Sequence, residues 1–253
     1  MVAPSFIALF TAILTVTAAP ELDAATVQEL ISQGDRLLQA EDKFPHSFEQ
    51  ALVLYRQAVR MEPDNALPYL RVATACLALG DGVKENPLVW YEQGERAAEK
   101  AMTVEENSPD AHFLFAANKG NVVNLRPFWK VSPGVVAELE THLLRALALS
   151  PRHSRANHMM GMLLYRTPGP LRLLLVGTRD QAESYLVRAV EADPNFTEAR
   201  FDLARFYTET GRPDQARRHA QAILTMSNPT PRRVWVEKYR PAAEKLLKTL
   251  PSQ

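Results

Sequence analysis

A short phrase recurs four times along the chain, and its spacing limits the folds that the chain can adopt. It reads ValArgAlaValGluAlaAspPro at 187–194, and related versions stand at 56–63, 99–106 and 144–151. A fixed period of this size is typical of a repeat solenoid, in which each unit packs only on its neighbours. The phrases are 43, 45 and 43 residues apart when measured between their central alanines, Ala58, Ala101, Ala146 and Ala189.

Apolar residues follow a helical period through most of the chain, and turn signals divide it into pairs of helices. Ser108–Pro109 and Ser132–Pro133 are start signals, because proline lacks the N–H that would be unpaired in a first turn. We therefore expect an all-α solenoid over 25–250, with five helix pairs and a C-terminal capping helix that Pro241 breaks or kinks. The expected helices cover about 25–38, 47–61, 66–79, 88–104, 110–124, 133–149, 152–166, 180–192, 196–210 and 213–226.

The fifth unit, residues 197–224, carries the packing residues of a tetratricopeptide repeat, which it resembles. Ala204 and Ala216 stand where two helices would cross, and only small side chains let helices approach there. Gly161 and Ala73 take the same place in the fourth and second units. The resemblance implies a tetratricopeptide-repeat solenoid that binds proteins or peptides.

Units one to four are longer than the usual repeat of 34 residues, and the surplus lies between the two helices of each pair. The fourth long loop is preceded by MetGlyMetLeuLeuTyrArgThrPro at 160–168 and ends in ValGlyThrArgAspGlnAla at 176–182. This layout resembles the periplasmic T component of tripartite ATP-independent (TRAP) transporters and related exported bacterial repeat proteins. It is also similar to eukaryotic regulator-of-microtubule-dynamics proteins, which share long third and fourth repeats. The first resemblance implies a non-catalytic accessory of a solute transporter.

The first 19 residues contain no charged side chain. The apolar run is shorter than the roughly 20 residues of a membrane-spanning helix, and small residues at Val16 and Ala18 fit a signal-peptide cleavage site. We expect residues 1–19 to be a signal peptide, which predicts a periplasmic or otherwise exported protein. Because the segment lacks a basic start, the alternative is an apolar anchor in which residues 5–19 hold the protein at a membrane.

Charge is distributed unevenly, although the formal net charge is zero. Residues 1–110 carry a net charge of −9, residues 111–196 carry +4 and residues 197–253 carry +5. A neutral chain argues against general nucleic-acid binding, which needs a basic domain. The acidic front and basic back would suit head-to-tail packing in a homo-oligomer or the steering of a partner, or would simply be solvated faces.

The sequence contains none of the common motifs of hydrolases, metalloproteases or nucleotide-binding proteins. His153 and His158 are five residues apart, which does not place them on one helical face as a metal pair would be. Cys76 aligns with the packing position of Tyr207, so we expect a buried and inert thiol. We therefore predict no catalysis, no metal and no cofactor.

The long third and fourth loops are unusually apolar for loops. These loops either fold over the concave side and fill it, or line a pocket or present a patch for a partner. The candidate residues are Phe128, Trp129, Leu171, Leu173 and Leu174.

The first helix of each pair lines the concave groove in tetratricopeptide-repeat proteins, and matching the units assigns further residues to it. Arg166 and Arg205 could grip the carboxylate of a peptide or an organic acid through paired N–H donors. An ordinary ion pair of Arg205 with Glu209 or Glu198 explains the same residues. The groove candidates are His158, Met162, Arg166, Phe201, Arg205 and Glu209.

Three functions fit these observations. The first is a non-enzymatic exported scaffold that binds a protein or peptide, such as a solute-binding protein or a transporter subunit. The second is a small-ligand carrier, in which the apolar loops enclose an organic acid or a lipid-like molecule. The third is a structural subunit of a larger membrane-associated assembly.

Overall fold

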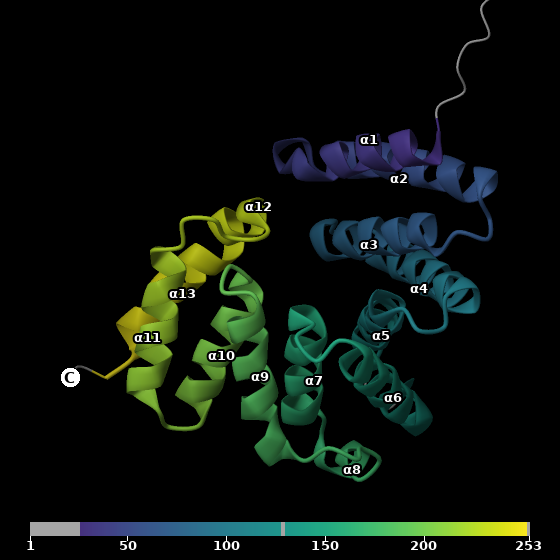
Figure 1. The fold of residues 1–253 in the computed structure, drawn as a ribbon. Helices are drawn as coiled ribbons and strands as arrows, with labels where there is room; N and C mark the ends of the chain where they lie inside the picture. Colours follow the sequence, from purple (N-terminus) through teal and green to yellow (C-terminus); the bar gives the residue numbers. More distant parts are fainter. Residues whose placement is uncertain (1–25, 128–129, 252–253) are drawn as a thin grey trace, which may run out of the picture.

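The structure is a computed structural model that describes residues 26–127 and 130–251 of the chain. These residues form five helix pairs and a C-terminal helix (Figure 1), so the predicted all-α solenoid is confirmed. The first helices of the pairs are α1 (Val27–Gln39), α3 (Ala66–Gly82), α5 (Pro109–Asn124), α7 (Ser154–Arg166) and α10 (Thr197–Glu209). The second helices are α2 (His46–Met61), α4 (Pro87–Val104), α6 (Pro133–Leu149), α9 (Ala182–Ala192) and α11 (Pro213–Leu224).

Short helical turns occupy two of the connections that the sequence predicts as long loops. They are η1 (Glu41–Lys43) in the first pair, and α8 (Gly169–Arg172) and η3 (Arg179–Gln181) in the fourth. The C-terminal part consists of α12 (Arg232–Val234), the wide π-helical turn η4 (Trp235–Tyr239) and α13 (Arg240–Thr249). Pro241 lies in the first turn of α13, directly after the wide turn, so the predicted irregularity is present.

Side chains cap several helices, including the helix with the predicted start at Ser108. The hydroxyl of Ser108 accepts a hydrogen bond from the N–H of Ala111 at 3.4 Å, and the amide oxygen of Asn65 accepts one from Leu67 at 3.0 Å. Ser132 also stands at a helix start, but its side chain makes no capping hydrogen bond. The predicted helix start at Ser132 is therefore confirmed in position.

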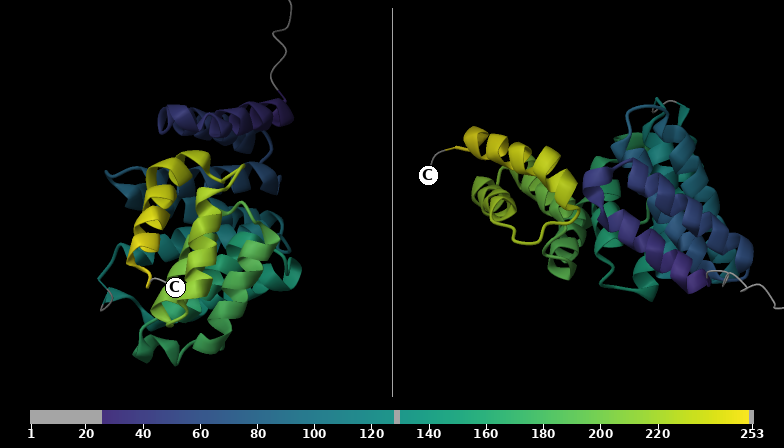
Figure 2. Two further views of the ribbon diagram at one scale, coloured as in Figure 1. Left: turned by 90° about the vertical axis from the view of Figure 1, so that its left-hand side faces the viewer. Right: turned by 90° about the horizontal axis from the view of Figure 1, so that it is seen from above.

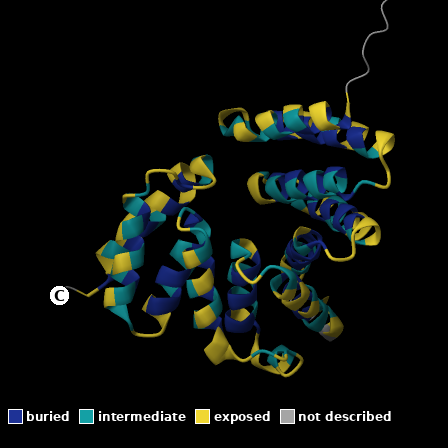
Figure 3. Cartoon of the chain, in the orientation of Figure 1, coloured by how far each residue is buried: buried dark blue, intermediate teal, exposed yellow. Residues whose placement is uncertain are grey.

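The four central alanines of the repeated phrase lie in the core. Ala58, Ala101, Ala146 and Ala189 are all 0% exposed. Each lies on a second helix, where a small side chain lets the neighbouring helix pack closely. The buried residues lie where neighbouring helices face each other, and the exposed residues cover the outer faces of the helices (Figure 3).

Helices also cross closely at the predicted small residues. Ala204 and Ala216 are both 0% exposed. A Cβ atom added to Gly161 would lie 2.8 Å from Cγ of Leu186 and 3.1 Å from the carbonyl oxygen of Ala182. The α7–α9 crossing therefore has no room for a side chain at Gly161.

The superhelix curls until its last elements meet its first (Figures 1 and 2). The backbone N–H of Arg233 in α12 donates a hydrogen bond to Glu41 of η1 at 2.6 Å. The Arg233 guanidinium lies 4.1 Å from the centre of the Phe44 ring. This ring also rests on Gly82, so closely that a Cβ atom there would overlap it. We call these contacts of Glu41, Phe44, Gly82 and Arg233 the seam.

Candidate functional site

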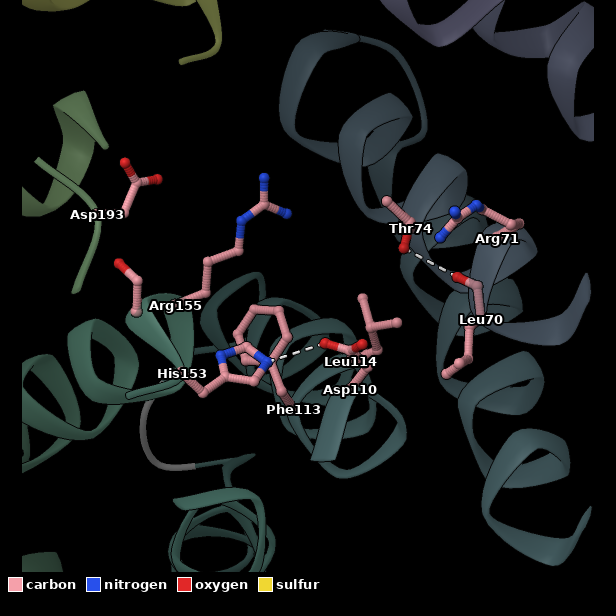
Figure 4. Close-up of a pocket in the computed structure, with 10 residues that line it drawn as sticks. Leu70, Arg71, Thr74, Asp110, Phe113, Leu114, His153, Arg155 and Asp193 are labelled. Carbon is pink, nitrogen blue, oxygen red and sulfur yellow. Dashed lines mark hydrogen bonds and ion pairs between the residues drawn. The ribbon is translucent and has the colours of Figure 1, made fainter. Parts of the chain in front are cut away.

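A pocket of about 350 Å³ opens between the first helices of the second, third and fourth pairs (Figure 4). Phe113 and Leu114 of α5 form its apolar floor, and these two side chains are nearly buried, at 7% and 4% exposure. Its wall is polar and comes from three helices and the end of a fourth. The residues that line it are Leu70, Arg71, Thr74, Asp110, Phe113, Leu114, His153, Ser154, Arg155 and Asp193.

His153 and Asp110 fix one side of the pocket. Nδ1 of His153 accepts a hydrogen bond from the N–H of Ala156 at 3.1 Å, which caps the start of α7. The remaining ring nitrogen, Nε2, then donates to the Asp110 carboxylate at 3.0 Å. The hydrogen bond from His153 holds the pKa of Asp110 below its usual value, so this carboxyl is ionised.

Arg71 is held by a carboxylate at the edge of the pocket. Its Nε and Nη2 donate to the two carboxylate oxygens of Asp35 at 2.8 and 3.1 Å. The hydroxyl of Tyr55 donates to the same Asp35 at 2.7 Å. This paired geometry joins the first and second helix pairs and neutralises the Arg71 charge.

Arg155 has no such partner. Among the residues that the structure describes, its guanidinium makes no ion pair and no hydrogen bond. The side chain is exposed and projects from the start of α7 into the pocket (Figure 4). A guanidinium with unused donors above an apolar floor is suited to binding a carboxylate whose neighbouring groups are apolar.

An acidic side chain, Asp81 near the end of α3, lies within electrostatic range of Arg155. It accepts hydrogen bonds from the Tyr91 hydroxyl at 2.8 Å and from the Asn121 amide at 3.1 Å. Burial raises the pKa of Asp81 to about 6, the hydrogen bond from Tyr91 opposes this rise, and the charge of Arg155 lowers the pKa by a smaller amount. The surface of Asp81 is nevertheless solvent exposed, so water weakens this effect.

The structure brings His158 and the helix α10 together. Nε2 of His158 lies 2.9 Å from a carboxylate oxygen of Asp202, and both side chains are largely shielded. Phe201 packs against Tyr239 of η4, with ring centres 5.6 Å apart. Met162 is half-buried against the core. These three candidates are therefore in contacts within the chain.

The structure does not bring Arg166 and Arg205 together around a shared site for a carboxylate. Arg205 forms an ion pair with Glu209 one turn later, at 3.3 Å, as the alternative of an ordinary ion pair describes. Glu209 also accepts a hydrogen bond from the Tyr165 hydroxyl at 2.6 Å. Arg166 is exposed at the end of α7. The two arginines do not line the pocket described above.

The candidates in the long loops lie on the surface or outside the described residues. Leu171 is half-buried, whereas Leu173 and Leu174 are 88% and 42% exposed. The expectation that this loop fills the concave side is wrong for Leu173 and Leu174. The buried carboxylate of Glu140 on α6 accepts the N–H groups of Val176 and Gly177, both at 2.7 Å, and so holds the loop against α6. Phe128 and Trp129 lie outside the residues that the structure describes.

Sequence reasoning missed Arg155 because it followed the register along the fourth unit only from His158 onward, and it missed Asp110 because it assigned no groove residues in the third unit. The same register marks these residues. They stand six positions before the small crossing residues Gly161 and Ala116, as Glu198 stands before Ala204. The register therefore contains the signal for the pocket, although it does not show which arginine is already paired.

Three further features concern binding chemistry and membranes. Over residues 26–127 and 130–251, no group of three or more His, Cys, Asp and Glu side chains is placed to hold a metal ion. Cys76 is fully buried, and burial raises the pKa of its thiol to about 12. Within the same ranges, none of the helices combines the length and apolar character needed to cross a membrane.

Two family models match successive parts of the chain. The family model "Regulator of microtubule dynamics protein 1-3" matches residues 30–168, and a tetratricopeptide-repeat model matches residues 173–233. No curated protein sequence matches the chain. The comparisons do not show the resemblance to the TRAP-transporter T component.

Solved structures of tetratricopeptide-repeat proteins share the fold. A thermophilic protein of this class from Thermus thermophilus has 17% identity and a TM-score of 0.65, over 88% of this chain and all of that chain. The type IV pilus biogenesis factor PilW has 19% identity and a TM-score of 0.53, over 79% and 76%. The pilF protein of Pseudomonas aeruginosa has 17% identity and a TM-score of 0.51, over 87% and 88%. At these identities the likeness concerns the fold alone.

Proposed function

Because the chain belongs to the regulator of microtubule dynamics protein 1-3 family, whose model covers more than half of it, we propose that it is a non-enzymatic scaffold that holds a protein partner in its groove. Tetratricopeptide-repeat solenoids present extended concave surfaces, and such surfaces are suited to peptide segments. The observation that carries the proposal is the pocket with the uncommitted Arg155 over Phe113 and Leu114.

The partner segment that suits this pocket is an extended peptide with a carboxylate next to an apolar side chain. The carboxylate would accept N–H donors of Arg155, and the apolar group would cover Phe113 and Leu114. Asp110 accepts a hydrogen bond from the neutral ring of His153 and keeps its negative charge, so the partner carboxylate is expected on the Arg155 side of the pocket, away from Asp110. The carboxylate is either an acidic side chain or the free C-terminus of the partner.

A peptide array with free C-termini tests the proposal, with Arg155→Gln as the variant. Loss of a charge-assisted hydrogen bond costs about 1.5–3 kcal/mol, so we expect affinity for the selected peptides to fall by about tenfold or more. Arg152→Gln is the matched control, since Arg152 is exposed near the start of the same helix but does not line the pocket. Equal affinity in the two variants would reject the pocket as the binding site.

The family description concerns microtubule dynamics, and this makes polymerised tubulin the first partner to test. Cosedimentation of the chain with microtubules, and its loss in Arg155→Gln, would support that partner. The alternative partners from the sequence remain predictions, namely a solute-binding protein or a transporter subunit. Export through residues 1–19 also remains a prediction and concerns residues that the structure does not describe.

A further inference from the structure

Three apolar side chains project from the loop between α8 and η3. Leu173 is 88% exposed, Val176 is 85% exposed and Leu174 is 42% exposed. Single exposed apolar residues are common, but three within four positions make this loop unusually apolar at its surface. We call Leu173, Leu174 and Val176 the tip.

The tip is held firmly in place. The carboxylate of Glu140 is 2% exposed and accepts the N–H groups of Val176 and Gly177, both at 2.7 Å. Leu175, in the middle of the same run, packs against the core. Gly177 lies against Leu164 of α7, where an added Cβ atom would be 2.7 Å from Cδ2 of Leu164. A buried carboxylate thus fixes a loop that turns one leucine inward and presents the tip to solvent.

Basic side chains accompany the tip. Arg166 and Arg179 are exposed before and after the loop, and Arg172 lies directly before Leu173. The Arg172 guanidinium donates to the carbonyl of Thr167 at 2.7 Å, and the Arg179 guanidinium lies 4.9 Å from the centre of the Tyr165 ring. Asp180 is the one acidic residue in the segment 166–180.

We propose that the tip docks on a membrane surface that contains anionic lipids. Leu173, Leu174 and Val176 enter the boundary between headgroups and acyl chains, and the arginines face the lipid phosphates. Apolar insertion combined with basic residues is the pattern of interfacial attachment. Three side chains are too few for the roughly 800 Å² per partner of a stable protein interface, which favours a lipid surface over a protein.

Docking by the tip leaves the groove open. The tip follows the C-terminal end of α7, whereas Arg155 stands at the N-terminal end of the same helix. The inference therefore does not depend on the proposed function, and a failure of either leaves the other standing.

The test uses the full chain with phosphatidylcholine vesicles, prepared with and without phosphatidylserine. A Leu174→Cys variant is labelled with an environment-sensitive dye, since the native thiol of Cys76 is buried and does not compete. We expect a blue shift with the phosphatidylserine vesicles. A dye at Val53→Cys, an exposed site on α2, is the matched control and should not shift.

A second variant, Leu173→Ser with Val176→Ser, separates the tip from any other route to the membrane. It should abolish the blue shift at position 174, and Arg166→Gln with Arg179→Gln should weaken the preference for phosphatidylserine severalfold. Circular dichroism checks that these surface variants fold. An unshifted dye at position 174 would overturn the inference, whether or not the chain sediments with the vesicles. Equal shifts with both vesicle types would overturn the role of anionic lipid.

Discussion

The backbone N–H of Arg233 donates a hydrogen bond of 2.6 Å to the carboxylate of Glu41, although the two residues are 192 positions apart. The contact joins the C-terminal helices to the first helix pair across the whole length of the repeats. Stacking of the Arg233 guanidinium on Phe44 adds a cation–π interaction. The seam therefore converts an open solenoid into a nearly closed turn.

Glu41→Ala is expected to open the seam without unfolding the repeats. It removes one charge-assisted acceptor at the surface, so the loss of stability should be about 1 kcal/mol, while the ends of the superhelix separate. Small-angle scattering should report a larger radius of gyration. The control is Glu237→Gln, which removes an exposed carboxylate paired with the Arg233 side chain but leaves the seam acceptor in place. An unchanged radius in Glu41→Ala would show that the seam does not set the shape.

Gly161→Ala is expected to destabilise the fourth pair by about 1–3 kcal/mol, because its Cβ would lie 2.8 Å from Leu186. Helix propensity alone predicts the opposite sign, with alanine better by about 1 kcal/mol. The sign of the change in the thermal midpoint therefore distinguishes close packing from propensity. Gly169→Ala is the matched control, since no atom lies within 4 Å of its added Cβ. Similar midpoints for the two variants would contradict the close crossing.

His219 is expected to make the protein less stable in mild acid. Burial, together with Arg200 and Arg218, lowers the pKa of His219 to about 4, whereas the unfolded chain has a pKa of about 6.5. Between about pH 6.5 and 4, His219 is protonated in the unfolded state but remains neutral in the folded state. Stability should therefore fall by up to about 1.4 kcal/mol per pH unit between about 6.5 and 4. Burial also lowers the pKa of His142, which acts in the same direction.

The measurement is the urea midpoint at about pH 7 and about pH 5, which bracket the ordinary pKa of histidine. His219→Gln should reduce the difference between the two midpoints, and His46→Gln, at an exposed position, should leave it unchanged. Protonation of Asp81 has the opposite effect on stability, because it favours the folded state. Its raised pKa of about 6 means that the folded state binds a proton first as the pH falls below 6. A midpoint difference that survives in His219→Gln would assign the acid effect to other groups.

Cys76 is expected to resist thiol reagents in the native protein. The side chain is 0% exposed, and its pKa is raised to about 12 by burial, so the reactive thiolate is scarce at neutral pH. The rate of labelling by a disulfide reagent should be slow in buffer and fast in denaturant. Rapid labelling in buffer would mean that the second and third helix pairs open readily.

Local patterns in the sequence account for most of the fold. The helical period, the alanine phrase and the small residues at Gly161 and Ala204 place the ten paired helices to within a few residues, because each of these signals acts between neighbours. The seam has no such signal. Glu41 and Arg233 look like ordinary surface charges, and only the accumulated curvature of all the repeats brings them together.

The candidate site was predictable in part, for a related reason. The repeat register identifies which helix faces inward, and so it can point to Arg155. The register does not reveal that Asp35 already neutralises Arg71 while Arg155 remains unpaired among the described residues. Glu140 also looks like a solvated helix residue, yet it is buried and binds two backbone N–H groups of a loop 36 residues later. Such pairings depend on distances in space rather than on spacing in the chain.

The seam also limits how this protein can evolve. An open solenoid lengthens by duplication of a unit, since each new repeat needs only a neighbour on which to stack. Here an inserted unit would carry Arg233 away from Glu41 and turn both ends out of register. The number of repeats is therefore fixed by the closure itself, and change should be confined to the loops and to the residues that face inward.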